Sequence, residues 1–263
     1  MNRKAVVLIP LVLAGLIFAV VSLYKKGADS HALIPVLTTT AVTAISKKEI
    51  SSFTDSRDNN VYQIVSIGNQ VWMAENLKYL PSVVDPRSGS DSNTAPYYYV
   101  YGYAGSVVAD AKATANYQTY GVLYNWAAAM AGLPSRELIP SGVQGVCPSG
   151  WHLPSNGEWE ELIDYLGGEE IAGGKLKEAG TAHWSSPNTG ATNEVGFTAL
   201  AGGYRDTDKT FKDIADVGYW WSTTEHYKFD YLAWYPYVSF DLNKVSEISS
   251  SKESGFSIRC VRD

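Results

Sequence analysis

The chain of 263 residues contains only two cysteines, four histidines and three methionines. Cys147 and Cys260 do not form a Cys-x-x-Cys pair, and no second histidine or cysteine lies at the spacing of a zinc site. A Gly-x-Ser-x-Gly motif and a paired-carboxylate motif are also missing. We therefore expect a protein that is not an enzyme, because the sequence does not bring the usual catalytic side chains together.

Positive charge is scarce after the first 50 residues. Residues 51–263 contain 15 lysines and arginines against 25 aspartates and glutamates, a net charge of −10. Because an acidic domain repels phosphate backbones, we expect no nucleic acid partner. Aromatic residues make up 13% of the chain, beside 23 glycines and 11 prolines, which favours a loop-rich α+β domain over a helical bundle.

One long apolar run lies near the N-terminus. Residues 5–23 carry no charge and are flanked by Arg3-Lys4 and Lys25-Lys26. The 19 residues approach the roughly 20 that span a bilayer, so we favour a signal-anchor over a cleaved signal peptide for residues 1–26. Residues 27–52 are interpreted as a linker and residues 53–263 as one domain, attached to a membrane by residues 5–23 and lying in the cell envelope or outside the cell.

The clearest helix signal follows Cys147. Ser155 and Glu158 form a capping box, in which each side chain accepts the backbone N–H of the other residue. Gly167-Gly168 supplies a stop signal, so we expect a helix over residues 156–166. Its apolar face is spaced at i, i+3, i+4 and i+7 and consists of Trp159, Leu162, Ile163 and Leu166.

A β-hairpin is predicted where two alternating runs, 61–67 and 70–73, flank Gly68-Asn69. The remaining elements are less sharply marked. We expect helices over 121–132 and 172–179, and strands over 97–103, 193–200, 219–224, 232–241 and 256–261. Pro236 within the fourth of these strands indicates a sheet edge or a bulge.

Cys147 and Cys260 are the only cysteines of a domain that we expect outside the cytoplasm. We therefore predict one disulfide between them. The alternatives are a reactive thiol and a metal site, but only His152 lies close to either cysteine in the sequence.

Six segments carry a distinctive pattern of Gly, Tyr, Trp and Cys. They are Gly68-Asn-Gln-Val-Trp-Met-Ala-Glu-Asn-Leu77, Tyr120-Gly-Val-Leu-Tyr-Asn-Trp126, Cys147-Pro-Ser-Gly-Trp-His-Leu-Pro-Ser155, Gly202-Gly-Tyr-Arg205, Gly218-Tyr-Trp-Trp-Ser-Thr-Thr-Glu225 and Gly255-Phe-Ser-Ile-Arg-Cys-Val-Arg262. In content and order, over residues 53–263, they resemble the Fibrobacter succinogenes major paralogous domain. That family occurs in exported proteins of Bacteroidetes and Fibrobacteres-type bacteria, so the resemblance implies export rather than an activity.

A wider resemblance concerns the fold. Leu153-Pro-Ser155 with Glu158-Trp159, and Gly255-Phe256 with Arg259–Arg262, are similar to the C-type-lectin-like and formylglycine-generating (sulfatase-modifying) fold. In C-type lectins a cysteine near the first major helix pairs with one in the last strand, and Cys147 and Cys260 look like comparable places. The resemblance implies an α+β C-type-lectin-like domain with a small twisted antiparallel sheet, two or more short helices and long loops, preceded by one N-terminal hydrophobic helix.

The motifs that carry activity in these relatives are altered here. Formylglycine-generating enzymes use a dedicated pair of reactive cysteines, whereas both cysteines of this chain take the structural positions. C-type lectins hold calcium and sugar with Glu-Pro-Asn or Gln-Pro-Asp and with Trp-Asn-Asp, whereas this chain has Ser186-Pro187-Asn188 and no Trp-Asn-Asp. The one cofactor we consider is Ca²⁺ at a different loop site, and the alternative is a set of solvated loop side chains. The candidate ligands are Asn188, Asn193, Glu194, Asp206 and Asp208.

Two functions are consistent with an exported, aromatic-rich domain. The first is a non-catalytic surface module that binds a polysaccharide or a protein; the second is a structural, adhesin-like scaffold. An enzyme of formylglycine-generating-like fold ranks behind both. The candidate stacking residues for a ligand, each of which has a core position as its alternative, are Trp184, Trp221, Tyr235 and Tyr237.

Overall fold

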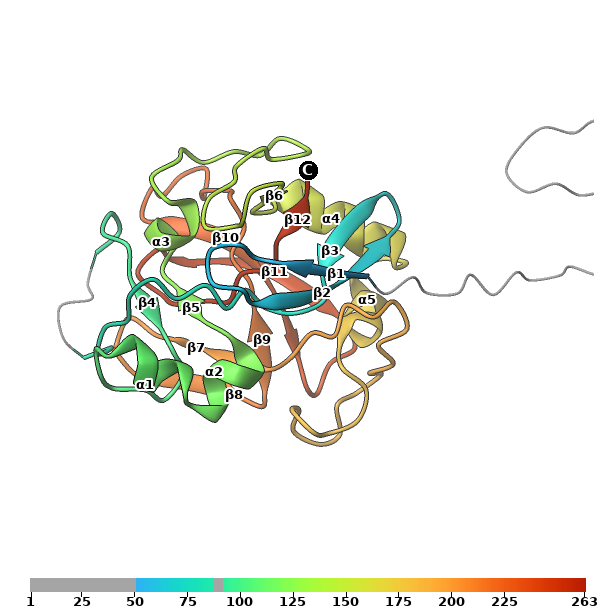
Figure 1. The fold of residues 1–263 in the computed structure, drawn as a ribbon. Helices are drawn as coiled ribbons and strands as arrows, with labels where there is room; N and C mark the ends of the chain where they lie inside the picture. The colour runs from blue at the N-terminus through green and yellow to red at the C-terminus, as the bar shows by residue number, and fades with distance from the viewer. Residues whose placement is uncertain (1–50, 88–91) are drawn as a thin grey trace, which may run out of the picture. The chain divides into compact units, whose positions relative to one another are not determined.

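The computed structural model describes residues 51–87 and 92–263 (Figure 1). The expected membrane segment 5–23 lies outside these ranges, as does the expected linker 27–52 except for its last two residues. The first strand begins at Ser51 and so includes those two residues. Within the described ranges, no helix is both long enough and apolar enough to cross a membrane.

The strands form one larger sheet and three smaller ones, and every strand pairing is antiparallel. The five-stranded sheet has the order β1 (Ser51–Thr54), β2 (Val61–Ile67), β3 (Gln70–Met73), β12 (Val261–Arg262) and β6 (Trp151–His152). A three-stranded sheet has the order β11 (Val245–Ser251), β10 (Leu232–Ser239) and β9 (Val217–Tyr219). Two-stranded pairs are formed by β4 (Tyr98–Tyr99) with β5 (Leu123–Tyr124), and by β7 (Gly202–Arg205) with β8 (Phe211–Ile214).

Five short helices accompany these sheets in the described part of the chain. They are α1 (Val108–Lys112), α2 (Ala115–Tyr120), α3 (Trp126–Met130), α4 (Asn156–Tyr165) and α5 (Glu169–Leu176). The architecture is therefore a mixed α and β domain with a curled antiparallel sheet, few short helices and long loops, as expected.

Several predicted elements are confirmed. The hairpin β2–β3 turns at Gly68-Asn69, and Gly68 takes the left-handed φ of +60° that such a turn requires. Both hydrogen bonds of the capping box form at the start of α4. The predicted apolar face of α4 is fully buried, with each of its four side chains at most 2% exposed.

Other elements differ from the prediction, for local reasons. The helix expected over 121–132 is shorter, because Gly121 has a φ of +79° and the Asn125 side chain caps a helix that begins at Trp126. The strand expected over 193–200 does not form, because Asn193 and Thr198 both have positive φ; the strand begins at Gly202 instead.

Pro236 lies inside β10, which is the central strand of its sheet. Proline cannot donate a backbone hydrogen bond, so a central strand tolerates it only where a ladder ends. The ladder between β10 and β9 ends at Tyr237, paired with Tyr219, and the Pro236 carbonyl still accepts the Trp220 N–H at 3.2 Å.

Two buried clusters make up the core. One contains the apolar face of α4 and lies against β3, where the rings of Trp72 and Trp159 are 4.6 Å apart. The other surrounds the two cysteines and includes Tyr62, Trp221 and Phe256. Tryptophan and tyrosine fill the space between short strands, because their large rings bury more apolar area per residue than aliphatic side chains do.

The last segment of the chain lies between elements from the first half of the domain. Figure 1 shows β12, in red, beside β3 and β6. The preceding residues 255–260 form backbone hydrogen bonds with several other parts of the chain. Their partners include Arg205, Tyr124, Trp221, Leu77 and Met73.

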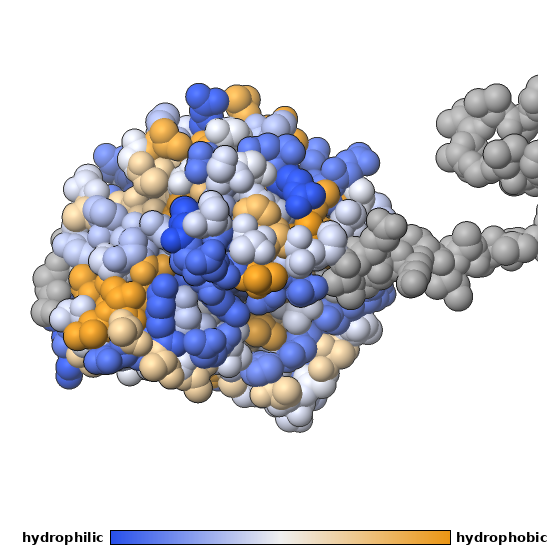
Figure 2. Space-filling model, viewed as in Figure 1, coloured by the Kyte–Doolittle hydropathy of each residue, from blue (hydrophilic) through white to orange (hydrophobic). Residues whose placement is uncertain are grey.

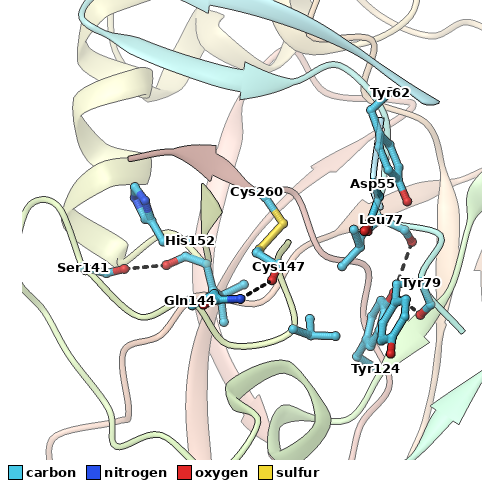
Figure 3. The surroundings of a disulfide bond; sticks show 12 residues. Asp55, Tyr62, Leu77, Tyr79, Tyr124, Ser141, Gln144, Cys147, His152 and Cys260 are labelled. Carbon is cyan, nitrogen blue, oxygen red and sulfur yellow. Dashed lines mark hydrogen bonds between the residues drawn. A yellow bond between two sulfur atoms is a disulfide. The ribbon is translucent and has the colours of Figure 1, made fainter. Parts of the chain in front are cut away.

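Cys147 and Cys260 form the predicted disulfide (Figure 3), with their Cα atoms 6.0 Å apart and both side chains fully buried. The bond joins the loop before β6 to the residue before β12. Since 113 residues separate the two cysteines, the bond removes a large amount of conformational freedom from the unfolded chain.

We predict that Cys147→Ser with Cys260→Ser lowers the free energy of unfolding by about 4–5 kcal/mol, the entropic value for a loop of this length. Urea denaturation of the oxidised chain and of the double variant measures the difference. Reduction of the parent chain is the matched control, because it breaks the same bond without changing a residue. A loss below about 1 kcal/mol would show that the packing around Cys260 suffices without the bond.

Candidate functional site

A group of aromatic side chains, several of them exposed, lies on the loop before β10 and at the start of that strand. We define the 226–234 aromatic cluster as His226, Tyr227, Phe229, Tyr231 and Trp234. The His226 ring lies parallel to three neighbours, with centroids 4.7 Å from Tyr227, 5.3 Å from Phe229 and 5.6 Å from Trp234. The Tyr227 side chain is 86% exposed, so one aromatic ring of this stack is presented to solvent.

Local hydrogen bonds fix this loop. His226 Nδ1 accepts the backbone N–H groups of Lys228 and Phe229 at 3.2 Å each, which holds the turn and places the ring proton on Nε2. The His226 N–H donates to the Leu232 carbonyl, so the loop closes at its base. The aromatic cluster is therefore carried by a closed turn at the start of a strand.

A concavity of about 490 Å³ lies between this loop and the segment after α3. Most of its lining side chains are charged; the lining residues are Ser135, Arg136, Glu137, Glu225, His226, Tyr227, Lys228 and Asp230. The two walls are linked, because Ser135 Oγ donates to the Thr223 carbonyl at 3.0 Å and accepts the Glu225 N–H at 2.9 Å. An exposed aromatic face beside several hydrogen-bonding groups is the usual composition of a binding site for a polar organic ligand.

The Glu225 side chain, at the edge of this concavity, is held in place by a buried lysine. Its carboxylate pairs with the ammonium group of Lys252, which is buried and lies over the ring of Trp126 at 4.3 Å. The pair leaves the second carboxylate oxygen of Glu225 as an acceptor next to the concavity.

A different apolar region is visible in Figure 2. Hydrophobic residues are scattered over that face, and their largest group lies in the region of β4 and α1, where Val107 is 52% exposed. Val107 lines neither the 490 Å³ concavity nor the second one, of about 260 Å³, so this group is a weaker candidate.

The predicted stacking residues lie elsewhere, which corrects that prediction. Trp184, Trp221 and Tyr235 are buried, and both indole N–H groups are used inside the protein, by the carbonyls of Ala199 and Tyr124. Tyr237 is half-buried and stacks on Tyr219. The rings of Trp184, Trp221 and Tyr235 fill the core, so these three offer no open face to a sugar ring.

Four of the five candidate calcium ligands have side-chain oxygens that contact protein partners; the exception is Asn188. Asp206 and Asp208 both pair with Lys212, and Glu194 pairs with Lys175 at 3.2 Å. Within the residues that the structure describes, no three His, Cys, Asp or Glu side chains are grouped to hold a metal ion.

The two asparagines of that set stabilise turns. The Asn193 amide oxygen accepts the Thr198 N–H at 2.9 Å, and the Asn188 amide N–H groups donate to the carbonyls of Glu178 and Gly180. Asn188 Oδ1 is buried without a hydrogen-bond partner. Calcium binding by these loops stays a prediction.

A lysine holds the same loop region. Lys177 is fully buried, and its ammonium group donates to the carbonyls of Thr189, Ser239 and Leu242 at 2.7–2.9 Å. Burial lowers the pKa of Lys177 to about 8, more strongly than the charge of Asp241 raises it. Sequence analysis did not single out this residue, since its partners are backbone carbonyls from three separate segments.

His152 has a structural position beside the disulfide loop (Figure 3). Its ring is 2% exposed and lies between two carboxylates, with Nε2 at 2.7 Å from Glu158 and Nδ1 at 2.7 Å from Asp263. The Glu158 carboxylate also accepts the N–H groups of Ser141 and Ser155. The capping box of α4 is thus part of a buried network.

Comparison with known proteins identifies the family. The model of the Fibrobacter succinogenes major domain matches residues 65–262. The chain belongs to this family. Neither the curated proteins nor the solved structures contain a match. The matched residues include both cysteines, all of α4 and the 226–234 aromatic cluster, so the candidate site lies within the family domain.

The sequence contained a signal for this site that was missed. In the segment His226-Tyr-Lys-Phe-Asp-Tyr231, aromatic residues alternate with charged ones, which resembles an ordinary half-buried strand. Only the closure of the loop at His226 turns the alternation into a stack at the surface.

We predict that His152 makes folding stability depend on pH. Burial alone would lower the pKa of His152, but the hydrogen bonds and charges of Glu158 and Asp263 outweigh it and raise the pKa. The stabilisation is therefore fully present below the unfolded value of about 6.5 and is lost as the pH rises through the folded value. Urea denaturation of the parent and of His152→Gln between pH 5 and pH 9 should give a difference in unfolding free energy that shrinks with rising pH. A difference that stays constant would contradict this.

We predict that Lys177→Met lowers the free energy of unfolding by about 3 kcal/mol, because it removes the ammonium group that donates to the carbonyls of Thr189, Ser239 and Leu242. The matched control is Lys175→Met on the same helix, which removes an exposed ion pair and should cost less than about 1 kcal/mol. Chemical denaturation of both variants compares the two values. Equal losses would mean that the three carbonyls find other donors.

Proposed function

We propose that the domain is a non-catalytic binding module that works outside the cytoplasm and binds a polysaccharide at the 226–234 aromatic cluster. The observation that carries the proposal is the Tyr227 ring, stacked on His226 and 86% exposed beside a concavity with a charged lining. A ligand that covers an exposed aromatic side chain removes apolar surface from water, which favours binding. Among the large hydrophobic side chains of the described residues, Tyr227 is the most exposed.

The chemistry of the concavity supports a sugar ligand. A sugar ring has an apolar face of C–H groups, which packs on an aromatic ring, and a rim of hydroxyl groups, which need hydrogen-bond partners. Glu137, Glu225 and Asp230 supply acceptors, and Arg136 and Lys228 supply donors. Both signs of charge are present, so a neutral, hydroxyl-rich ligand fits the lining better than a highly charged polymer does.

The proposed location rests on the sequence and on the disulfide. Residues 5–23 would anchor the chain in a membrane, with residues 27–50 as a spacer to the domain, which begins with β1 at Ser51. A buried disulfide between the only two cysteines suits an oxidising compartment. We also propose a C-type-lectin-like fold, because the disulfide joins the loop before the main helix α4 to the last strand region.

A protein ligand or a scaffold role is the second candidate, favoured by one observation. Leu138 and Ile139, directly after the wall of the concavity, are 62% and 52% exposed. Exposed aliphatic side chains next to an aromatic cluster are typical of protein contacts. This candidate predicts self-association or a protein partner instead of polysaccharide binding.

We predict that Tyr227→Ala weakens polysaccharide binding at least tenfold and leaves thermal stability unchanged, because this exposed ring contacts the ligand more than the core. The purified full-length chain is first run on a glycan array. The affinity for the best polysaccharide is then measured by isothermal titration for the parent and the variant.

The matched control is Tyr165→Ala, which removes another tyrosine, 64% exposed on α4, away from the concavity. Equal losses in both variants would locate the binding elsewhere. An array without any binding partner, together with concentration-dependent self-association, would reject the polysaccharide and support the scaffold role.

A further inference from the structure

A second concavity, of about 260 Å³, lies between the segment after β3, the end of α2 and the residues before β7. It is lined by Ala74, Glu75, Asn76, Lys78, Gln118, Thr119, His183, Thr198, Leu200 and Arg259. None of these residues belongs to the 226–234 aromatic cluster or to its concavity. The proposed polysaccharide site therefore leaves this one unassigned.

Arg259 is the unusual member of this lining, because its side chain is fully buried. Its guanidinium group donates only to neutral oxygens; these are the carbonyls of Met73, Phe197 and Thr198 and the amide oxygen of Asn76. Nε is buried and has no hydrogen-bond partner. Four neutral acceptors satisfy the N–H groups at the end of the side chain but do not balance its charge.

The other charged groups of the lining are already paired. Lys78 contacts Glu75 at 3.2 Å, and His183 contacts Glu178 at 2.8 Å. Among the residues that the structure describes, no carboxylate forms an ion pair with Arg259. The cavity therefore borders one positive charge that is not ion-paired with any acid of the described residues.

Aromatic rings offset part of that charge. The Arg259 guanidinium carbon lies 4.2 Å from the centre of the Phe197 ring and 5.9 Å from that of Trp220. Burial nonetheless lowers the pKa of Arg259 to about 9, more strongly than the charge of Glu75, which lines the same concavity, raises it. A buried cation of this kind is stabilised when an anion is brought close to it.

We propose that this concavity binds a small molecule through a single carboxylate group, whose charge complements that of Arg259. One uncompensated positive charge matches a monoanion, whereas a phosphate dianion would leave an excess negative charge next to Glu75. Gln118 and Thr119 at the rim have amide and hydroxyl groups that hydrogen-bond the rest of such a ligand. The volume limits the ligand to a small organic acid or the carboxylate end of a larger molecule.

The test uses the purified full-length chain and three probes: sodium acetate, acetamide as its neutral isostere, and inorganic phosphate. Thermal unfolding is followed at pH 7 with sodium chloride keeping the ionic strength constant. We expect acetate to raise the unfolding midpoint in a saturable way, with an apparent affinity at least tenfold higher than those of acetamide and phosphate.

Two variants locate the effect. Thr119→Trp fills the concavity and should abolish the response to acetate, whereas Thr207→Trp adds the same side chain at an exposed turn and should keep it. Tyr227→Ala should also keep it, so that a failure here is distinguishable from a failure of the polysaccharide site. The proposal is overturned by an absent response, by equal responses to acetate and acetamide, by a preference for phosphate, or by an unchanged response in Thr119→Trp.

Discussion

The rest of the structure depends on how the final segment is held between earlier elements. From Gly255 to Val261, successive residues bond to strands and loops that are far apart in the sequence, and Cys260 adds a covalent bond to the loop at Cys147. Short strands gain little from pairing alone, so an arrangement of two- to eight-residue strands needs such a shared partner. This segment contributes side chains to both core clusters.

Buried polar side chains then form hydrogen bonds with backbone groups of the loops, as strand pairing does in regular sheets. Arg259, Lys177 and Asn125 each donate to backbone carbonyls of segments that are separate in the sequence. The cost of burying a charge is offset only when most of its hydrogen bonds are made, as they are for Lys177. The guanidinium group of Arg259 forms four hydrogen bonds but no ion pair with the described residues. We therefore propose that the cavity beside it prefers a ligand with a carboxylate group.

Holding the loops firmly also explains where a binding surface can arise. The turn 226–231 precedes β10, and its base is closed by the hydrogen bond from the His226 backbone N–H to the Leu232 carbonyl. Because the Tyr227 ring stacks on His226, which is held by the closed turn, it lies at the surface and not against the core. Such loops on a rigid support carry the specificity of many domains whose shared fold says little about function.

The amino-acid sequence by itself determined the local elements with strong short-range signals and the family. The capping box at Ser155, the turn at Gly68 and the alternating run of β10 are specified by neighbouring residues, so they form as predicted. The disulfide followed from having only two cysteines. Which aromatic rings face solvent was decided by the tertiary structure, because distant segments pack over Trp221 and leave Tyr227 exposed. The charge left unbalanced at Arg259 is likewise invisible in the sequence, since its surroundings come from segments brought together only by folding.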